Sequence, residues 1–278
     1  MNRIDAKFRA LRATGEKGFI AYIGAGDPDL KATAALARAF EGAGVDLLEL
    51  GVPFSDPLAD GVVNQLAAER GLRSGTTLAS LLAMVATLRQ GGCRIPIVFY
   101  IYFNLIHRHG VKQFARAAAA AGVDGVLALD LPPEESAGYE QELKRAGLCP
   151  IYLIAPTTPD RRITEISRHA SGFLYYVSRE GVTGMQSTVA RSIAPKLAAI
   201  RRHTAVPVAI GFGISTPAQA RAVAAHGDAV VVGSAIVNQI ATQGKAKDMV
   251  SRVSAFVAPL VRAVKSLQPF NHSPFTSL

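Results

Sequence analysis

Two carboxylates are the residues of this chain best placed for proton chemistry. Glu49 lies near the end of an apolar run, residues 45–53, and Asp60 lies in a stretch interrupted by proline and glycine, residues 54–61. Burial in an apolar strand raises the pKa of a carboxyl group, so that it can transfer protons near neutral pH. A loop carboxylate at the edge of the solvent stays ionised and acts through its charge. We therefore predict that Glu49 is a catalytic acid or base and that Asp60 acts electrostatically; the alternative for Glu49 is a structural ion pair with a cation on a neighbouring strand.

Two glycine-rich turns indicate a phosphate site. The stretch GFGIS, residues 211–215, follows one apolar run, and Gly233 and Ser234 follow the next and precede a helical pattern from Ala235. Glycine lets backbone N–H groups approach an anion closely, and a helix N-terminus adds partial positive charge. The alternative is that these glycines only make tight turns. The first turn has no glycine at position 216, so it lacks the dinucleotide-binding pattern.

Other kinds of active site are not supported. The histidines show no metal-ligand spacing, and the lysines all fall in helical or loop patterns, so that no apolar run ends in a Schiff-base lysine. A Gly-x-Ser-x-Gly motif is absent from the sequence. Cys93 and Cys149 lie too far apart in sequence for a metal-binding pair and suggest no disulfide framework. We expect neither a metal nor a covalent lysine intermediate.

Short apolar runs alternate with longer helical patterns along the whole chain. Eight runs are rich in Val, Ile, Leu, Phe or Tyr: residues 19–25, 46–52, 96–102, 125–129, 150–154, 172–177, 207–210 and 229–232. They lack the polar alternation of a half-exposed sheet, which is typical of parallel strands buried on both faces. The pattern predicts an α/β fold, a (β/α)8 barrel formed as one domain by residues 1–268. We also predict an extra N-terminal helix, an insertion after the second strand and a flexible tail formed by residues 269–278.

Helices are expected between these runs. Terminal glycines and a Thr-Pro start predict helices at residues 32–43, 111–121, 134–146 and 216–226. We take Asp27 as an N-cap, and Asp56 is a second candidate for that role.

The chemistry of such a barrel lies on the loops that follow the strands. Glu49, Asp60, Asp130 and Tyr175 would share this face with the two glycine turns. Residues 178–184, SREGVTG, follow the sixth run and suggest a lid that closes over a substrate, with a plain solvated loop as the alternative.

Composition narrows the function classes. The chain has 278 residues, of which 49% are hydrophobic and 18% are charged, as in ordinary soluble proteins. No apolar run approaches the roughly 18 residues that a membrane span needs, and the N-terminal segment lacks the apolar core of an export signal. The net charge of +9 is dispersed rather than clustered. We expect a cytoplasmic protein that binds neither nucleic acid nor membranes.

One stretch resembles a known family. The sequence LELGVPFSDPLADG at residues 48–61 is similar to the signature of the tryptophan synthase alpha chain. The similarity extends over about residues 1–268, through the Asp27-Pro28 turn and through residues 102–104, 130–136, 178–184, 211–215 and 233–237. The resemblance implies a TIM barrel that cleaves indole-3-glycerol phosphate to indole and glyceraldehyde 3-phosphate. Protonation of the indole ring provides the electron sink, so neither a metal nor a Schiff base is needed.

The resemblance also implies roles for individual residues. Glu49 would shuttle protons at ring carbon C3 and at the substrate hydroxyl, while Asp60 would accept the ring N–H. The substrate-binding residues would be Tyr22, Tyr100, Leu127, Tyr175, Thr183, Gly184, Phe212, Gly213, Gly233 and Ser234. The chain itself would carry no cofactor.

A partner follows from the same resemblance. Indole would pass to a beta chain that holds pyridoxal phosphate, in an alpha2-beta2 tetramer. The interface with this chain would include Pro53, Asp56, Pro57, Asn104 and Pro132.

Four positions depart from the family pattern, and three alternatives stay open. Val62 and Glu180 bear on the timing of the loops, while Tyr100 and Leu129 are bulkier than in some relatives and bear on the fit of the pocket.

The alternatives are a stand-alone lyase that releases free indole, a subunit that only activates its partner, and a different phosphate-binding barrel enzyme such as an isomerase.

Overall fold

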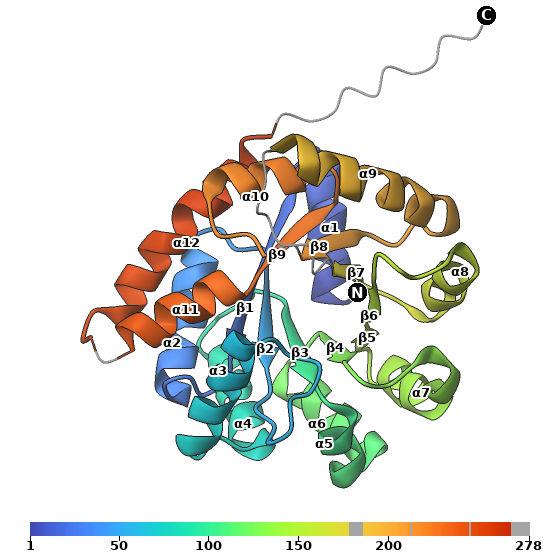
Figure 1. Ribbon diagram of the computed structural model, residues 1–278. Coiled ribbons are helices and arrows are strands. Elements are labelled where there is room, and N and C mark those ends of the chain that lie inside the picture. The colour runs from blue at the N-terminus through green and yellow to red at the C-terminus, as the bar shows by residue number, and fades with distance from the viewer. Residues whose placement is uncertain (178–185, 212, 245, 268–278) are drawn as a thin grey trace, which may run out of the picture.

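The structure, a computed structural model, describes residues 1–177, 186–211, 213–244 and 246–267. Its strands are β1 (Gly18–Gly24), β2 (Leu47–Gly51), β3 (Ile97–Ile101), β4 (Gly125–Ala128), β5 (Cys149–Pro150), β6 (Tyr152–Ile154), β7 (Leu174–Val177), β8 (Val208–Gly211) and β9 (Ala229–Val232). All strand pairs are parallel, and the helices surround the strands as an outer ring (Figure 1).

The sheet closes into the predicted barrel. Its order is β5-β4-β3-β2-β1-β9-β8-β7-β6, and β5 and β6 are two parts of the fifth predicted run, on either side of Ile151. β5 pairs with β4 and β6 pairs with β7, so this one run joins both ends of the sheet. The barrel therefore has eight strand positions, each at a run that the sequence predicts.

Helices connect the strands. They are α1 (Arg3–Thr14), α2 (Leu30–Gly42), α3 (Val62–Arg73), α4 (Leu78–Gln90), α5 (Phe103–His109), α6 (Val111–Ala121), η1 (Pro133–Glu135), α7 (Ala137–Arg145), α8 (Asp160–His169), α9 (Gln186–His203), α10 (Pro217–Ala224), α11 (Ser234–Gln243) and α12 (Met249–Lys265). The predicted insertion after the second strand contains both α3 and α4. The predicted helices at 111–121 and after Thr216 are confirmed; the Thr216 side chain accepts a hydrogen bond from Gln219 N.

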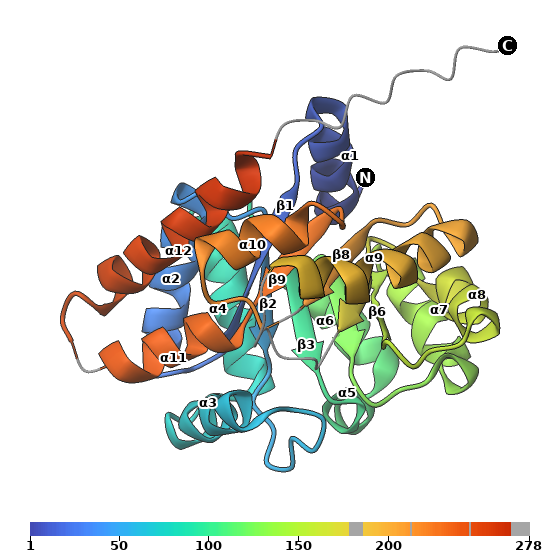
Figure 2. The ribbon, with the colours of Figure 1, turned by 45° about the horizontal axis from the view of Figure 1, so that its top comes forward.

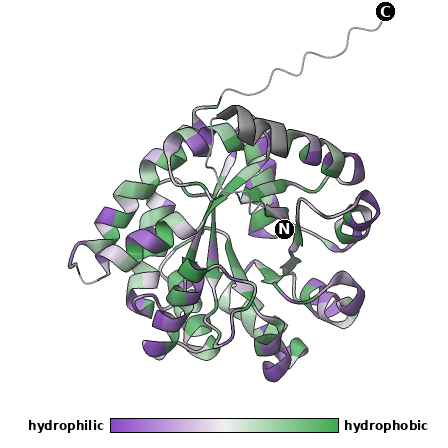
Figure 3. Cartoon of the chain, in the orientation of Figure 1, coloured by the Kyte–Doolittle hydropathy of each residue, from purple (hydrophilic) through white to green (hydrophobic). Residues whose placement is uncertain are grey.

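Strand side chains alternate between two apolar cores. Leu48 and Leu50 of β2 belong to the core between the sheet and the helices, whereas Leu47 belongs to the core inside the barrel. Both faces are buried, which explains why the strands read as continuous apolar runs. Figure 3 shows the same distribution, with hydrophobic strands at the centre and hydrophilic residues on the outer helices.

Helix α1 covers the N-terminal end of the barrel, as the predicted extra helix. Its buried side chains Ile4, Phe8 and Leu11 join the inner core, and the Phe8 ring lies 5.9 Å from the Phe173 ring. Figure 2 shows α1 at one end of the molecule, with α3 and the loop before it at the other.

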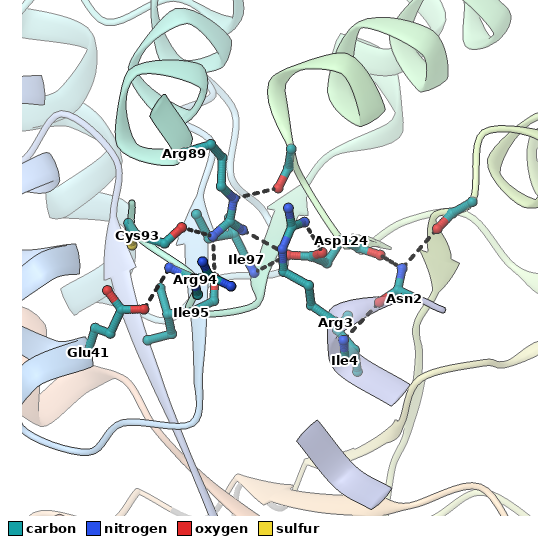
Figure 4. A network of polar contacts seen from close by, with 12 residues as sticks. Asn2, Arg3, Ile4, Glu41, Arg89, Cys93, Arg94, Ile95, Ile97 and Asp124 are labelled. Atoms are coloured by element: carbon teal, nitrogen blue, oxygen red, sulfur yellow. Dashed lines mark hydrogen bonds and ion pairs between the residues drawn. The ribbon is translucent and has the colours of Figure 1, made fainter. Parts of the chain in front are cut away.

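A polar network anchors α1 to the strands (Figure 4). Asp124, at the start of β4, accepts hydrogen bonds from Ile97 N at 2.8 Å, from Arg3 at 2.8 Å and from Arg89 at 2.9 Å. Asn2 donates to the Asp124 carbonyl at 2.7 Å. This end of the barrel is thus fixed by charged hydrogen bonds and leaves the opposite end for chemistry.

Two N-cap expectations are wrong. Helix α2 begins at Leu30, so Asp29 is its N-cap, while Asp27 forms a two-point ion pair with Arg70 at 2.7 Å. Asp56 caps no helix, since α3 has Gly61 as its N-cap.

The predicted helix at 134–146 is divided into η1 and α7 at Ser136. The Ser136 hydroxyl lies 2.7 Å from the Pro133 carbonyl oxygen and 2.6 Å from a Glu140 carboxylate oxygen, and its one proton can be donated to either. A short polar side chain that bonds to the nearby backbone competes with helical hydrogen bonding, which explains the break.

Candidate active site

Glu49 lies in the middle of β2 and faces the barrel interior. Its neighbours in register are Tyr22 of β1 and Val98 of β3, and like Leu47, two residues before it, it points inward. The residue is fully buried, and neither carboxylate oxygen has a hydrogen-bond partner among the residues described. Desolvation raises the pKa of Glu49 to about 8. Within the described part of the chain, the alternative of a structural ion pair has no partner to support it.

Asp60 lies at the end of the loop between β2 and α3, and two tyrosines hold its carboxylate. The Tyr100 hydroxyl donates to Oδ1 at 3.0 Å and the Tyr102 hydroxyl to Oδ2 at 2.9 Å. Asn64 adds a longer contact of 3.5 Å to Oδ1. Burial raises the pKa of Asp60, while the hydrogen bonds from Tyr102, Tyr100 and Asn64 lower it. The loop folds back over the strand ends and half-buries Asp60, which is why burial acts on its pKa. The electrostatic role of Asp60 stays a prediction.

Three aromatic side chains from different strands line the interior beside Glu49. Tyr22 and Tyr100 meet edge to face, with ring centroids 5.0 Å apart, and Tyr175 comes from β7. Leu127 of β4 is fully buried in the same inner core, and Leu129 packs against it. The predicted indole-binding residues that the structure describes are thus brought together; Phe212 lies outside the described residues.

Glycines on neighbouring strands make room for these rings. A Cβ atom at Gly51 would lie 2.3 Å from the Tyr22 hydroxyl, and one at Gly211 would lie 2.6 Å from the Tyr175 hydroxyl. Gly233 is less crowded, with Tyr22 at 3.3 Å from its Cβ position. Gly211 therefore has a packing function that the sequence did not suggest.

The two glycine turns lie at the ends of adjacent strands, β8 and β9. Gly213 is exposed and has a φ of 61°, with open space around its Cβ position. Gly233 is the N-cap of α11, which begins at Ser234, and Ile236 N and Val237 N bond to its carbonyl. The first N–H groups of a helix have no partner within it, so this corner can receive an anion. Thr183 and Gly184 lie outside the described residues, as does Glu180.

The residues expected at a protein interface lie around the same end of the barrel. Asp56, Asn104 and Pro132 are exposed, Pro57 is half-buried and Pro53 is buried. Asp130 accepts a hydrogen bond from Phe103 N at 2.7 Å, which fixes the start of α5.

An exposed apolar surface beside them was not predicted. Leu58, Val62, Leu66 and Leu72 are 90%, 69%, 47% and 40% exposed, and they follow one another on the loop and on α3. The spacing of Val62 and Leu66, one helical turn apart, is the sequence signal that marks them as one surface. Exposed apolar residues that share a face, as Val62 and Leu66 do, mark interaction sites.

Two further features bear on cofactors and membranes. No group of three or more potential metal-ligating side chains occurs among the described residues, and the thiols of Cys93 and Cys149 are free and buried. None of the helices that the structure describes is long and apolar enough to cross a membrane.

Known proteins are similar to this chain in sequence and in fold. A family model described as tryptophan synthase alpha chain matches residues 8–265. The tryptophan synthase alpha chain of Opitutus terrae is 51% identical over 266 residues, which make up 95% of this chain and 100% of that protein. The crystal structure of the alpha subunit from Legionella pneumophila aligns with a TM-score of 0.88 at 37% identity, covering 96% of this chain and 100% of that one. A chain of tryptophan synthase from M. tuberculosis aligns with a TM-score of 0.84 at 30% identity, covering 95% of this chain and 98% of that one. This chain therefore belongs to the tryptophan synthase alpha chain family.

Proposed function

We propose that the chain performs the alpha reaction of tryptophan synthase with Glu49 as its proton-transfer group. The reaction is the retro-aldol cleavage of indole-3-glycerol phosphate to indole and glyceraldehyde 3-phosphate, the activity of this family. The observation that carries the assignment is a fully buried Glu49 without a partner among the described residues, whose pKa is raised to about 8. Such a carboxyl group is mostly protonated at neutral pH and is poised to act as a general acid.

The steps balance with a single shuttled proton. Protonated Glu49 gives its proton to ring carbon C3, which makes an iminium-like ring. The substrate hydroxyl next to the breaking bond then loses its proton to the Glu49 carboxylate. The electrons of the C–C bond flow into the ring as the aldehyde forms, and Glu49 ends protonated as it began.

Asp60 accepts the ring N–H and stabilises the positive charge that develops there. Its oxygens are held by Tyr100 and Tyr102, so the acceptor is in place before the charge appears. The phosphate group of the substrate would bind at Gly213, Gly233 and Ser234, together with Gly184. Tyr22, Tyr100, Leu127 and Tyr175, with Phe212, would enclose the indole ring, and Thr183 would contact Asp60 from the closed lid.

We also propose that the surface around α3 docks a tryptophan synthase beta chain. Leu58, Val62 and Leu66 supply the apolar centre, and the exposed Asp56 supplies charge at its rim. The interface would continue through Pro53, Pro57, Asn104 and Pro132. Leu58 lies on the loop that ends at Asp60, and Val62 and Leu66 lie on the helix that follows it, so docking would also order the catalytic carboxylate.

The proposed assembly is an alpha2-beta2 tetramer, with pyridoxal phosphate in the beta chain and no cofactor in this chain. The exposed apolar surface favours this partnered form over a stand-alone lyase. Residues 1–268 are proposed as the catalytic domain and residues 269–278 as a tail. The cytoplasmic location stays a prediction.

Release of glyceraldehyde 3-phosphate, coupled to an NADH-forming dehydrogenase, tests this function. The isolated chain should turn over slowly, and an added beta chain should increase the rate. Fast turnover that ignores the beta chain would identify a stand-alone lyase. If Asp60→Asn in complex with the beta chain cleaves the substrate as fast as wild type does, the proposed role of Asp60 is contradicted.

A further inference from the structure

The two tyrosines that hold Asp60 differ in their other contacts. The Tyr102 hydroxyl also accepts a hydrogen bond from Ala59 N at 2.9 Å, so it fixes the loop backbone as well as the carboxylate. The Tyr100 hydroxyl has one hydrogen bond within the described residues, the 3.0 Å contact to Oδ1 of Asp60. Tyr100 therefore acts on the Asp60 side chain without holding the loop.

Packing fixes the direction of the Tyr100 hydroxyl. The side chain leaves β3 toward the barrel interior, and its ring meets the Tyr22 ring edge to face at 70°. Gly51 and Leu127 are its neighbours in register on β2 and β4. Burial also raises the pKa of Tyr100, so the hydroxyl keeps its proton and remains a donor.

Within the part of the chain that the structure describes, hydrogen bonds leave Asp60 with one open acceptor position. An ionised carboxylate has about four lone-pair positions. Among the described residues Tyr100, Tyr102 and, at longer range, Asn64 occupy three of them. A small cavity beside these groups is lined in part by Tyr22, Asp60, Tyr100 and Tyr102 and has room for roughly one water molecule. Asp60 thus shares one small space with the three tyrosine side chains.

We propose that Tyr100 is a positioning residue, whose hydroxyl keeps Asp60 ionised and aims its open lone pair at the ring N–H of the substrate. This inference rests on the proposed function and gives Tyr100, beyond its place in the pocket wall, a specific effect on the charge and direction of Asp60. The physical reason is a competition at the carboxylate. Burial favours the neutral acid, which cannot stabilise a positive ring, and each donated hydrogen bond favours the anion.

The first test is the pH profile of kcat/KM for Tyr100→Phe in the complex with a beta chain. Loss of a hydrogen bond to a charged group should lower kcat/KM about 10- to 100-fold. The acid limb of the profile should move to higher pH, because Asp60 loses a donor that lowers its pKa. The matched control is Tyr139→Phe, which also removes a buried tyrosine hydroxyl. Among the described residues, that hydroxyl donates a hydrogen bond to the Val126 carbonyl at 3.4 Å. The control should keep the wild-type profile.

A second test measures the N–H contact directly. The probes are two non-cleavable ligands, an indolylalkyl phosphate and its benzofuran counterpart, which lacks the N–H. Wild type should prefer the indole ligand, and Tyr100→Phe should lose most of that preference while its melting temperature stays close to that of wild type.

The outcomes separate this inference from the proposed function. An unchanged acid limb with unchanged ligand preference would reduce Tyr100 to a pocket wall, if wild type still cleaves the substrate and Glu49→Gln does not. A lower KM with unchanged kcat would also overturn the inference, because Tyr100 would then compete with the substrate for Asp60. No cleavage by wild type would overturn the proposed function itself.

Discussion

Replacement of Glu49 by glutamine should abolish catalysis and stabilise the fold, and the gain in stability should depend on pH. The pKa of Glu49 is raised from 4.5 to about 8 by burial. In the unfolded chain this carboxyl group loses its proton above about pH 4.5, whereas in the folded chain it stays protonated up to about pH 8. Stability from this carboxyl is therefore fully present below pH 4.5 and is lost as the pH rises toward 8.

The size of the effect follows from the same shift. One pKa unit corresponds to about 1.36 kcal/mol, so the difference between 4.5 and about 8 gives a total loss of roughly 5 kcal/mol, with roughly 3 kcal/mol lost by pH 7. Glutamine does not titrate and has nearly the same shape. Glu49→Gln should therefore gain stability over wild type by about 1.4 kcal/mol per pH unit across this range.

Urea unfolding of the isolated chain at pH 5, 6, 7 and 8 measures this difference. The control is Glu135→Gln at an exposed position of η1, which should show no such slope. A difference between Glu49→Gln and wild type that stays constant with pH would refute the reasoning, because it would mean that folded Glu49 ionises normally.

Three other substitutions test the parts around the site. Asp124→Ala should lower the free energy of unfolding by about 3–5 kcal/mol, measured by urea unfolding, because Arg89 and Arg3 lose a buried partner; an effect below 1 kcal/mol would contradict the anchoring of α1. Gly51→Ala should reduce turnover and cost about 1–3 kcal/mol in stability, since the new methyl group overlaps the Tyr22 hydroxyl; wild-type values for both would place Tyr22 elsewhere. Leu58→Ser with Leu66→Ser should raise the Kd for the beta chain at least about tenfold by calorimetry, with little change in the unfolding midpoint; an unchanged Kd would move the interface away from α3.

The barrel was predictable because its signals are local. Each strand is a continuous apolar run, and Glu49 is conspicuous as the one carboxylate inside such a run near its end. Burial of that run follows from closure of the barrel. The raised pKa of Glu49 was therefore predictable too.

The surroundings of Asp60 depend on contacts between segments far apart in the chain. Tyr100 and Tyr102 reach Asp60 only because β3 pairs with β2 and the loop folds back over both. The two tyrosines are two residues apart at the end of one strand, so their side chains point to the same side. This spacing was the hint that the sequence offered. Asp27 was assigned to a cap for the same reason, since its partner Arg70 lies on α3 and no local pattern joins them. Pairings of this kind are set by the closed barrel and not by the neighbouring residues.

The most direct test of the central claim is single-turnover cleavage of indole-3-glycerol phosphate by Glu49→Gln, with the beta chain bound. General acid–base catalysis contributes about 10² to 10⁴ in rate, so the variant should release glyceraldehyde 3-phosphate at least about 100-fold more slowly than wild type while it still binds the substrate. Release at a rate within about tenfold of wild type would contradict the claim that Glu49 carries the proton.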